Sequence, residues 1–294
     1  MKKTIFYVSL AVLTMTALSC SNNADVTENN SDGYAPVTVS VNDFDLSFET
    51  FASRRATPVA DYSSVKAITL AFYDSDDTEV YKVTQIRSDN TTYTTFGQFS
   101  CSLGIGSYTM VVLGYGSDNP ISLTSKTNAT FTNEPVRETF LYTQTVNVTN
   151  TQPIALSATL NRVVARVGII STDKRPAEAA KLRLKFSAGG EGLNPMTGFS
   201  TTNTAFSILA ELSSDVGTTI GIARHLFLNS DEQTMTVTIE VLDADNEIIS
   251  QKVVNNVLLQ RNRYTQMTGS LFSSSSSSSF SVETGWLSQI DVSF

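Results

Sequence analysis

The chain has 294 residues, of which 41% are hydrophobic and 16% are charged, so it can bury a sizeable core and two domains are expected. Its 28 acidic residues outnumber its 20 basic residues, and the arginines and lysines form no cluster larger than a pair. This balance argues against nucleic acid as a partner, because binding to phosphates requires a basic patch.

The first 19 residues have the organisation of an export signal. Lys2 and Lys3 come first, an apolar stretch covers residues 5–18, and small residues precede Cys20. This pattern resembles a bacterial lipoprotein signal, which predicts that Cys20 carries lipid as the first residue of the mature chain. The alternative is a soluble secreted protein cleaved near Ser19. Residues 20–36 are polar, acidic and rich in turn signals, so we interpret them as a tether.

Residues 37–55 contain the pattern of a first strand. Apolar residues alternate from Val37 to Val41, slip by one position, and resume at Phe44. A slip of one residue in an alternating pattern indicates an extended segment with a bulge or break.

The same stretch ends in a short basic patch. Arg54 and Arg55 are followed by Ala56, a threonine and Pro58, a composition typical of exposed backbone that proteases cut. The sequence therefore predicts a strand that can be detached from the chain. The alternative is an ordinary first strand followed by a loop.

Downstream of Pro58, the apolar clusters are short, rich in β-branched residues and separated by turn signals, which predicts an all-β sandwich. We expect a first domain over residues 56–152 and a second over residues 153–294. The first contains candidate strands at residues 65–73, 79–86, 96–103, 107–115 and 139–148. The second contains them at residues 154–160, 163–169, 181–186 and 234–241, with a long polar loop over residues 189–204.

The end of the chain has a second unusual pattern. Residues 273–279 are consecutive serines, which predict a flexible linker without packing value. Beyond them, a set of apolar residues on even positions shares one face of an extended strand. They are Phe280, Val282, Trp286, Ile290, Val292 and Phe294. This strand is too long for one sandwich, so we expect residues 280–286 to complete the chain's own sheet and residues 287–294 to be a donor strand.

Few residues of the sequence indicate catalysis or metal binding. Catalysis and metal binding usually need several histidines, cysteines or clustered carboxylates, and the sequence has a single histidine, His225, in an apolar run. We interpret His225 as a packing residue. Cys101 is the only thiol left once Cys20 carries lipid, and we expect it in the core. The sequence predicts no enzymatic activity, no metal and no cofactor.

Taken in order along the chain, these motifs resemble the fimbrillin family of Bacteroidales, the subunits and anchors of type V pili. The resemblance begins with the signal ending at Cys20, the polar tether, the first strand, and SRRATP before VKAITLAFYD. It continues with LNRVVARVGI at the opening of the second domain and QRNRYTQMTGSLF before the stretch that contains Trp286. It covers most of the chain.

The resemblance implies two transthyretin-like β-sandwich domains in tandem and export as a lipoprotein to the outer membrane. It also implies cleavage by an arginine-specific surface protease after Arg55, or after Arg54, since the arginine is doubled. That cut removes the lipid and the first strand, and a strand from a neighbouring subunit fills the groove that is left.

We therefore expect a structural pilus subunit that supports adhesion, found on the outer membrane as a precursor and in the extracellular fimbrium. Its partners are copies of itself or related pilins, joined head to tail. One alternative is the lipidated anchor subunit of the same pilus, which keeps Cys20 and its first strand. The other is a surface lipoprotein that binds glycans through exposed aromatic residues.

Overall fold

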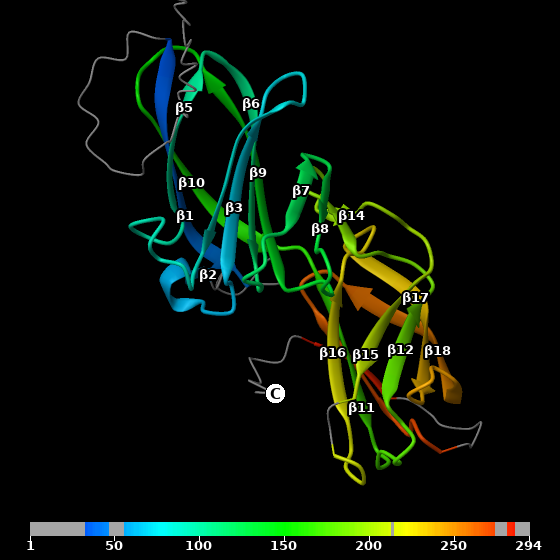
Figure 1. Cartoon of the computed structure of the whole chain (residues 1–294). Helices are drawn as coiled ribbons and strands as arrows, with labels where there is room; N and C mark the ends of the chain where they lie inside the picture. Colours follow the sequence, from blue (N-terminus) through cyan, green and yellow to red (C-terminus); the bar gives the residue numbers. More distant parts are fainter. Residues whose placement is uncertain (1–32, 47–55, 213–214, 274–280, 286–294) are drawn as a thin grey trace, which may run out of the picture.

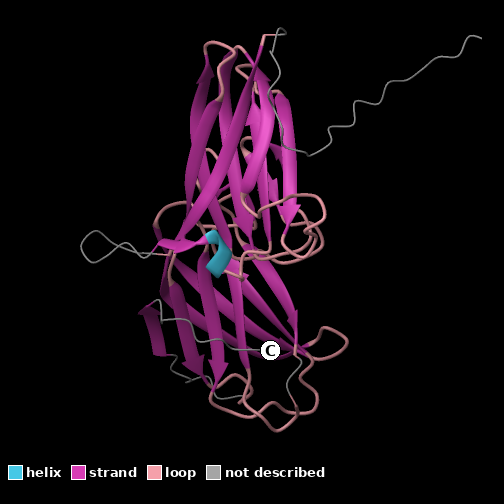
Figure 2. Cartoon of the chain, turned by 90° about the vertical axis from the view of Figure 1, so that its left-hand side faces the viewer, coloured by secondary structure: helices cyan, strands magenta, loops and turns pink. Residues whose placement is uncertain are grey.

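The chain folds into strands, apart from one short 3-10 helix, η1 (Val59–Asp61), in the part that the structure describes. The computed structural model describes residues 33–46, 56–212, 215–273 and 281–285. Two lobes are stacked end to end, with the N-terminal lobe uppermost in Figure 1, and Figure 2 shows the elongated outline from the side. The predicted all-β class is confirmed.

The N-terminal lobe is built on one eight-stranded sheet of order β2-β1-β10-β9-β6-β3-β4, with β5 paired to β1 outside this path. The strands are β1 (Tyr34–Asp45), β2 (Ala56–Pro58), β3 (Ala67–Tyr73), β4 (Glu79–Ile86), β5 (Gln98–Gly104), β6 (Gly106–Tyr115), β9 (Thr139–Val148) and β10 (Ile154–Arg162). Their inward side chains form one apolar core, and the removal of these side chains from water stabilises the folded lobe.

β1 contributes a continuous row of side chains to this core. Ala35, Val37, Val39, Val41 and Phe44 are at most 2% exposed. The register of β1 against β10 shifts between Val41 and Asp43, which returns Phe44 to the buried face. The predicted bulge is therefore confirmed.

β1 is also the strand on which its two neighbours depend for pairing. It pairs antiparallel with β5 on one side and parallel with β10 on the other. β10 pairs with β9 only at Asn161 and Arg162, and β5 has no other ladder partner among the described strands. Without β1, both neighbours would lose most of their backbone hydrogen bonds, and unpaired buried backbone groups are costly.

The sheet curls until the side chains of β4 reach the backbone of β5. Gln85 of β4 bridges this seam: its Nε2 donates to the carbonyl oxygen of Gln98 at 2.6 Å, and its Oε1 accepts from the N–H of Gly97 at 2.7 Å. Gln85 is 5% exposed, so its amide replaces water for two backbone groups of the β5 edge. This contact does not involve β1.

The C-terminal lobe is a sandwich of two four-stranded sheets, of order β16-β11-β19-β20 and β15-β12-β17-β18. The first contains β11 (Ala165–Ser171), β16 (Gly221–Leu226), β19 (Tyr264–Gly269) and β20 (Ser281–Gly285). The second contains β12 (Lys181–Phe186), β15 (Phe206–Glu211), β17 (Glu232–Leu242) and β18 (Ile248–Gln260). Alternating apolar residues from both sheets form a single core, as the patterns of β12 and β17 predicted.

β10 lies in the N-terminal lobe, whereas the sequence pattern placed residues 154–160 at the opening of the second domain. Parallel pairing with β1 holds it there, and its buried Ala158 and Leu160 join the N-terminal core. The chain enters the second lobe only after Val163 and Val164. Pairing between β1 and β10 joins segments far apart in the sequence, so local alternation does not reveal it.

A small sheet of order β14-β13-β8-β7 joins the two lobes. It combines β7 (Ser122–Ser125) and β8 (Asn128–Thr130) with β13 (Gly192–Asn194) and β14 (Phe199–Ser200). The last two lie in the stretch predicted to be a polar loop. The sequence did not reveal them, because strands of two or three residues show no alternation. Leu123, Leu193 and Phe227 are buried in one cluster with Tyr73 and Tyr115, so the lobes share part of their core.

We expect Phe44→Ala to lower the free energy of unfolding by about 3–5 kcal/mol, since it removes a fully buried ring and leaves a cavity. The matched control is Val80→Ala on β4, where the side chain is 44% exposed and the change should stay within about 0.5 kcal/mol. Urea unfolding followed by circular dichroism measures both. Equal stability of the two variants would contradict the role assigned to Phe44.

Candidate functional site

Within residues 33–46, 56–212, 215–273 and 281–285, no group of three or more histidine, cysteine, aspartate or glutamate residues could hold a metal ion. In the same part of the chain, no helix is long and apolar enough to cross a membrane. Among the residues that the sequence singled out, those that the structure describes occur in three places: the lobe junction, the channel filled by β1, and the base of the tail.

His225 lies on β16, directly opposite Arg166 of β11. Burial lowers the pKa of its imidazole to about 3, and the positive charges of Arg166, Arg162, Arg137 and Arg224 act in the same direction. The ring is therefore neutral at physiological pH. A neutral histidine among arginines fits the packing role predicted for it.

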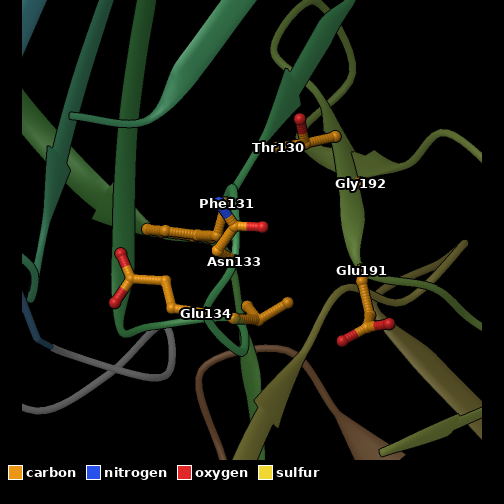
Figure 3. A pocket seen from close by; sticks show the side chains of 7 residues that line it. Thr130, Phe131, Asn133, Glu134, Glu191 and Gly192 are labelled. Carbon is orange, nitrogen blue, oxygen red and sulfur yellow. The ribbon is translucent and has the colours of Figure 1, made fainter. Parts of the chain in front are cut away.

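A pocket of about 300 Å³ opens beside the junction sheet, as Figure 3 shows. It is lined by Thr130, Phe131, Asn133, Glu134, Val136, Glu191 and Gly192. Glu134 accepts hydrogen bonds from Ser117 at 2.6 Å and from Arg137 at 3.0 Å. Glu191 comes from the opposite side of the pocket, and burial raises the pKa of its carboxyl. The two carboxylates are not paired for acid–base chemistry.

The channel that β1 fills is narrow along most of its length and wide at one end. No inward side chain of β1 before Phe44 is larger than valine. The ring of Phe44 then packs 4.9 Å from that of Phe140 and 5.8 Å from that of Tyr62, between centroids. Gly114 forms the floor, where a Cβ would come within 2.9 Å of the Phe44 ring. The wide end is therefore a pocket for one aromatic side chain.

A polar network fixes this wide end. Tyr62 donates to Glu138 at 2.8 Å, while Arg162 donates to the Tyr62 oxygen at 3.0 Å and pairs with Glu138 at 2.7 Å. Burial, and then the charge of Glu138, raise the pKa of Tyr62 to about 12, so the phenol keeps its proton. Arg162 also donates to Asn262 at 2.7 Å. Since Arg162 ends β10 and Asn262 precedes β19, the network links the pocket to both lobes.

The loop with the predicted cleavage site begins and ends at the wide end. Asp45, the last residue of β1, pairs with Ala56, the first residue of β2, so residues 47–55 connect two adjacent strands. A cleft of about 420 Å³ beside them is lined by Asp45, Ala56, Thr159 and Asn161. Ala56 is exposed. Arg54, Arg55 and Cys20 lie outside the described residues, and their roles stay predictions.

The two walls of the channel are β10 and β5, and Cys101 lies on β5. It is opposite Val37 of β1 and packs, half-buried, against the N-terminal core. Burial beside β1 raises the pKa of its thiol to about 12. The sequence predicted Cys101 in the core, and the structure places it at the edge of the N-terminal core, where it is partly buried.

The segment from which the tail departs is anchored on Asp173. Its carboxylate accepts hydrogen bonds from the Ser270 hydroxyl and from the N–H groups of Leu271, Phe272 and Ser273, at 2.5–2.9 Å. Burial acts to raise the pKa of Asp173, but these hydrogen bonds outweigh it and hold the pKa below its ordinary value. The ionised carboxylate thus fixes the chain at the start of the serine run.

β20 then pairs antiparallel with β19 at the edge of the chain's own sheet. Val282 lies opposite Met267 and is 41% exposed, because no further strand covers it in the described part of the chain. The other predicted donor residues lie outside the described residues. They are Phe280, Trp286, Ile290, Val292 and Phe294.

Sequence reasoning missed three residues that shape the channel: Gln85, Tyr62 and Gly114. Gln85 and Tyr62 act through partners far away in the sequence, so no local pattern marks them. Gly114 left one signal, because a glycine inside an apolar strand often marks close approach of a neighbour. Here the neighbour is Phe44.

Residues 115–293 match the family described as "Family of unknown function (DUF6562)". The chain belongs to this family. Among solved structures, the DUF6562 chain is similar to a candidate adhesin from Bacteroides ovatus, at 12% identity and a TM-score of 0.52, covering 88% of this chain and 97% of that one. It is also similar to the fimbrial anchor protein Mfa2 from Porphyromonas gingivalis, at 14% identity and a TM-score of 0.50, covering 86% and 98%. No curated protein matches it.

These similarities confirm the predicted resemblance at the level of the fold. The DUF6562 chain has the architecture of Bacteroidales fimbrial and adhesin proteins over most of its length. At such low identity, a shared fold does not transfer function from one protein to another.

We expect His225→Asn to flatten the pH dependence of stability between about pH 7 and pH 5. The folded pKa of about 3 lies below the ordinary value of 6.5, so the unfolded chain takes up the proton first as the pH falls. The contribution of His225 is therefore complete above pH 6.5 and is lost as the pH falls from 6.5 toward 3. Urea unfolding at several pH values measures this slope, and an unchanged slope in the variant would contradict the assignment.

We expect Asp173→Asn to speed amide hydrogen exchange at Leu271, Phe272 and Ser273 at neutral pH, since the variant lacks the charged acceptor. The folded pKa of Asp173 is below 3.8, so its stabilisation is present above pH 3.8 and is lost as the pH falls through the folded pKa. Asp76→Asn, in an exposed turn of the other lobe, is the control. Equal exchange in both variants would refute the anchoring role.

Proposed function

We propose that this DUF6562 chain is a structural subunit of a surface pilus, in which the tail of one subunit replaces β1 of the next. The observation that carries the proposal is the position of β1. It is the only ladder partner of β5 and the main partner of β10 among the described strands, yet its covalent connection to the strands that follow runs through residues 47–55. A cut after Arg54 or Arg55 severs β1 and leaves the remaining strands on one continuous chain.

The same physical terms favour replacement of the lost strand. Removal of β1 uncovers an apolar trench and two rows of unpaired backbone groups, and an incoming strand covers both at once. The trench is in the N-terminal lobe, whereas the tail leaves from β19 in the C-terminal lobe. Such a contact joins unlike surfaces, so it builds a filament and not a closed pair.

The proposal includes the route to the surface. Residues 1–19 are the signal, Cys20 carries lipid in the outer membrane, residues 20–36 are the tether, and residues 37–55 are removed on processing. The two lobes correspond to the tandem transthyretin-like domains of fimbrillins. The finished filament supports adhesion and has no enzymatic activity.

Two other roles make different predictions. A lipidated anchor subunit keeps Cys20 and β1, so the native protein would begin at Cys20, whereas a processed pilus subunit begins at Ala56. N-terminal sequencing of the native protein separates these cases. A glycan-binding surface lipoprotein would give signals on a glycan array as an unassembled monomer.

We expect the double variant Arg54→Ala, Arg55→Ala to stay lipidated, monomeric and bound to the membrane, because no arginine then precedes Ala56. Arg54→Lys, Arg55→Lys is the matched control for charge and should show the same defect if the protease is specific for arginine. Immunoblotting of membrane and shed fractions, together with electron microscopy, measures the outcome. Normal filaments from the double alanine variant would refute the processing step.

A further inference from the structure

The β10 wall of the channel fixes which residues of a replacing strand face inward. The partners of Val37, Val39, Val41 and Phe44 on β10 are Ile154, Leu156, Ala158 and Leu160. These partners are evenly spaced by two residues, although β1 itself is not, because its bulge adds a residue between Val41 and Phe44. A strand with a regular period of two therefore fits this wall without a bulge.

Side-chain size adds a second requirement. A row is the position opposite one residue of β10. In the folded chain, the rows of Ile154, Leu156 and Ala158 are filled by valines of β1, whereas the row of Leu160 is filled by the ring of Phe44 over Gly114. A matching strand therefore carries branched apolar residues followed, two positions later, by an aromatic residue.

Residues 288–294 of the tail have this pattern. Ile290, Val292 and Phe294 match the rows of Leu156, Ala158 and Leu160, and Ser288 falls on the row of Ile154. The single polar member, Ser288, takes the position of Val37, which is 1% exposed and lies between the half-buried Ile154 and Cys101.

On the basis of the proposed function, we infer that the tail of a second copy runs in the direction of β1 and places Phe294 in the pocket of Phe44. The Tyr34 end of β1 lies at the free tip of the N-terminal lobe (Figure 1), while the Phe44 end is linked to the C-terminal lobe through Arg162. A tail inserted in this direction enters the channel at the tip and ends beside the junction of the two lobes. In the opposite direction, Trp286 would meet the Phe44 pocket and Ser288 the buried row of Ala158.

This register also removes one irregularity from the pairing with β10. β1 leaves one residue out of register at its bulge, whereas the donor pairs with β10 without interruption. At the Gln98 end of β5, Gln85 binds Gly97 and Gln98 by two contacts that do not involve β1.

Cys101 provides a direct readout of the register. It is opposite Val37, so it is opposite Ser288 of the inserted tail, and it is the only cysteine left after processing removes Cys20. Facing residues of antiparallel strands have Cα atoms about 4.5–5.5 Å apart, which is within the range of a disulfide. We expect Ser288→Cys, processed and assembled with copper phenanthroline, to give a series of disulfide-linked oligomers on a non-reducing gel.

Ile290→Cys and Val292→Cys are the matched controls and should give no oligomers. Oligomers from Val292→Cys would indicate the opposite direction, and oligomers from Ile290→Cys a shift by two residues; either result overturns the inference. Filaments with no crosslink in any variant also overturn it. Adding Cys101→Ser must abolish the Ser288→Cys signal. If processed wild-type protein forms no filaments, the proposed function itself fails.

The aromatic pocket has its own test in tail variants. We expect Phe294→Ala to weaken assembly by on the order of 100-fold, the loss typical of a buried phenyl group, while Phe280→Ala, outside the channel, has little effect. Sedimentation of processed protein over a range of concentrations measures both. Equal assembly of the two variants would overturn the placement of Phe294.

Discussion

The structure of the N-terminal lobe depends on the pairing of one strand with two others at once. β1 gives β5 its only ladder and β10 most of its ladder within the described part of the chain, and the same strand lines the core from Ala35 to Phe44. Hydrogen bonds and apolar burial are thus concentrated in a segment at the beginning of the domain. The proposed removal of this segment would therefore uncover the apolar row and both ladders at once.

The parts of the channel that do not belong to β1 have their own supports. Gln85 holds the edge of β5 from across the seam, and Arg162 binds Tyr62, Glu138 and Asn262 at the wide end. These contacts use side chains and not strand ladders, and none of them has β1 as a partner. They connect the channel to the lobe junction, where a shared apolar cluster covers the outer face of the sheet. A preformed binding surface reduces the ordering that a partner must provide.

In the proposed assembly, a donor strand would use the same interactions that fold the N-terminal lobe. A donor strand needs only a matching alternation and a matching aromatic position, because the walls already provide backbone donors and acceptors in a fixed register. The segment that precedes the tail is anchored at Asp173 in the C-terminal lobe, whereas the channel filled by β1 lies in the N-terminal lobe. In the proposed assembly, each copy would give its tail to one neighbour and take the tail of another in its N-terminal lobe.

The sequence by itself determined the all-β class, the alternating inward face of β1 and its bulge near Asn42, since each of these depends only on local spacing of apolar residues. It also marked the resemblance whose fold the structural comparisons confirm. Only the tertiary structure decided that β10 pairs with β1, that Gln85 closes the seam and that Gly114 makes room for Phe44. These features join residues distant in the sequence, and pairing across such distances is set by register and shape in the folded chain, which local pattern does not record.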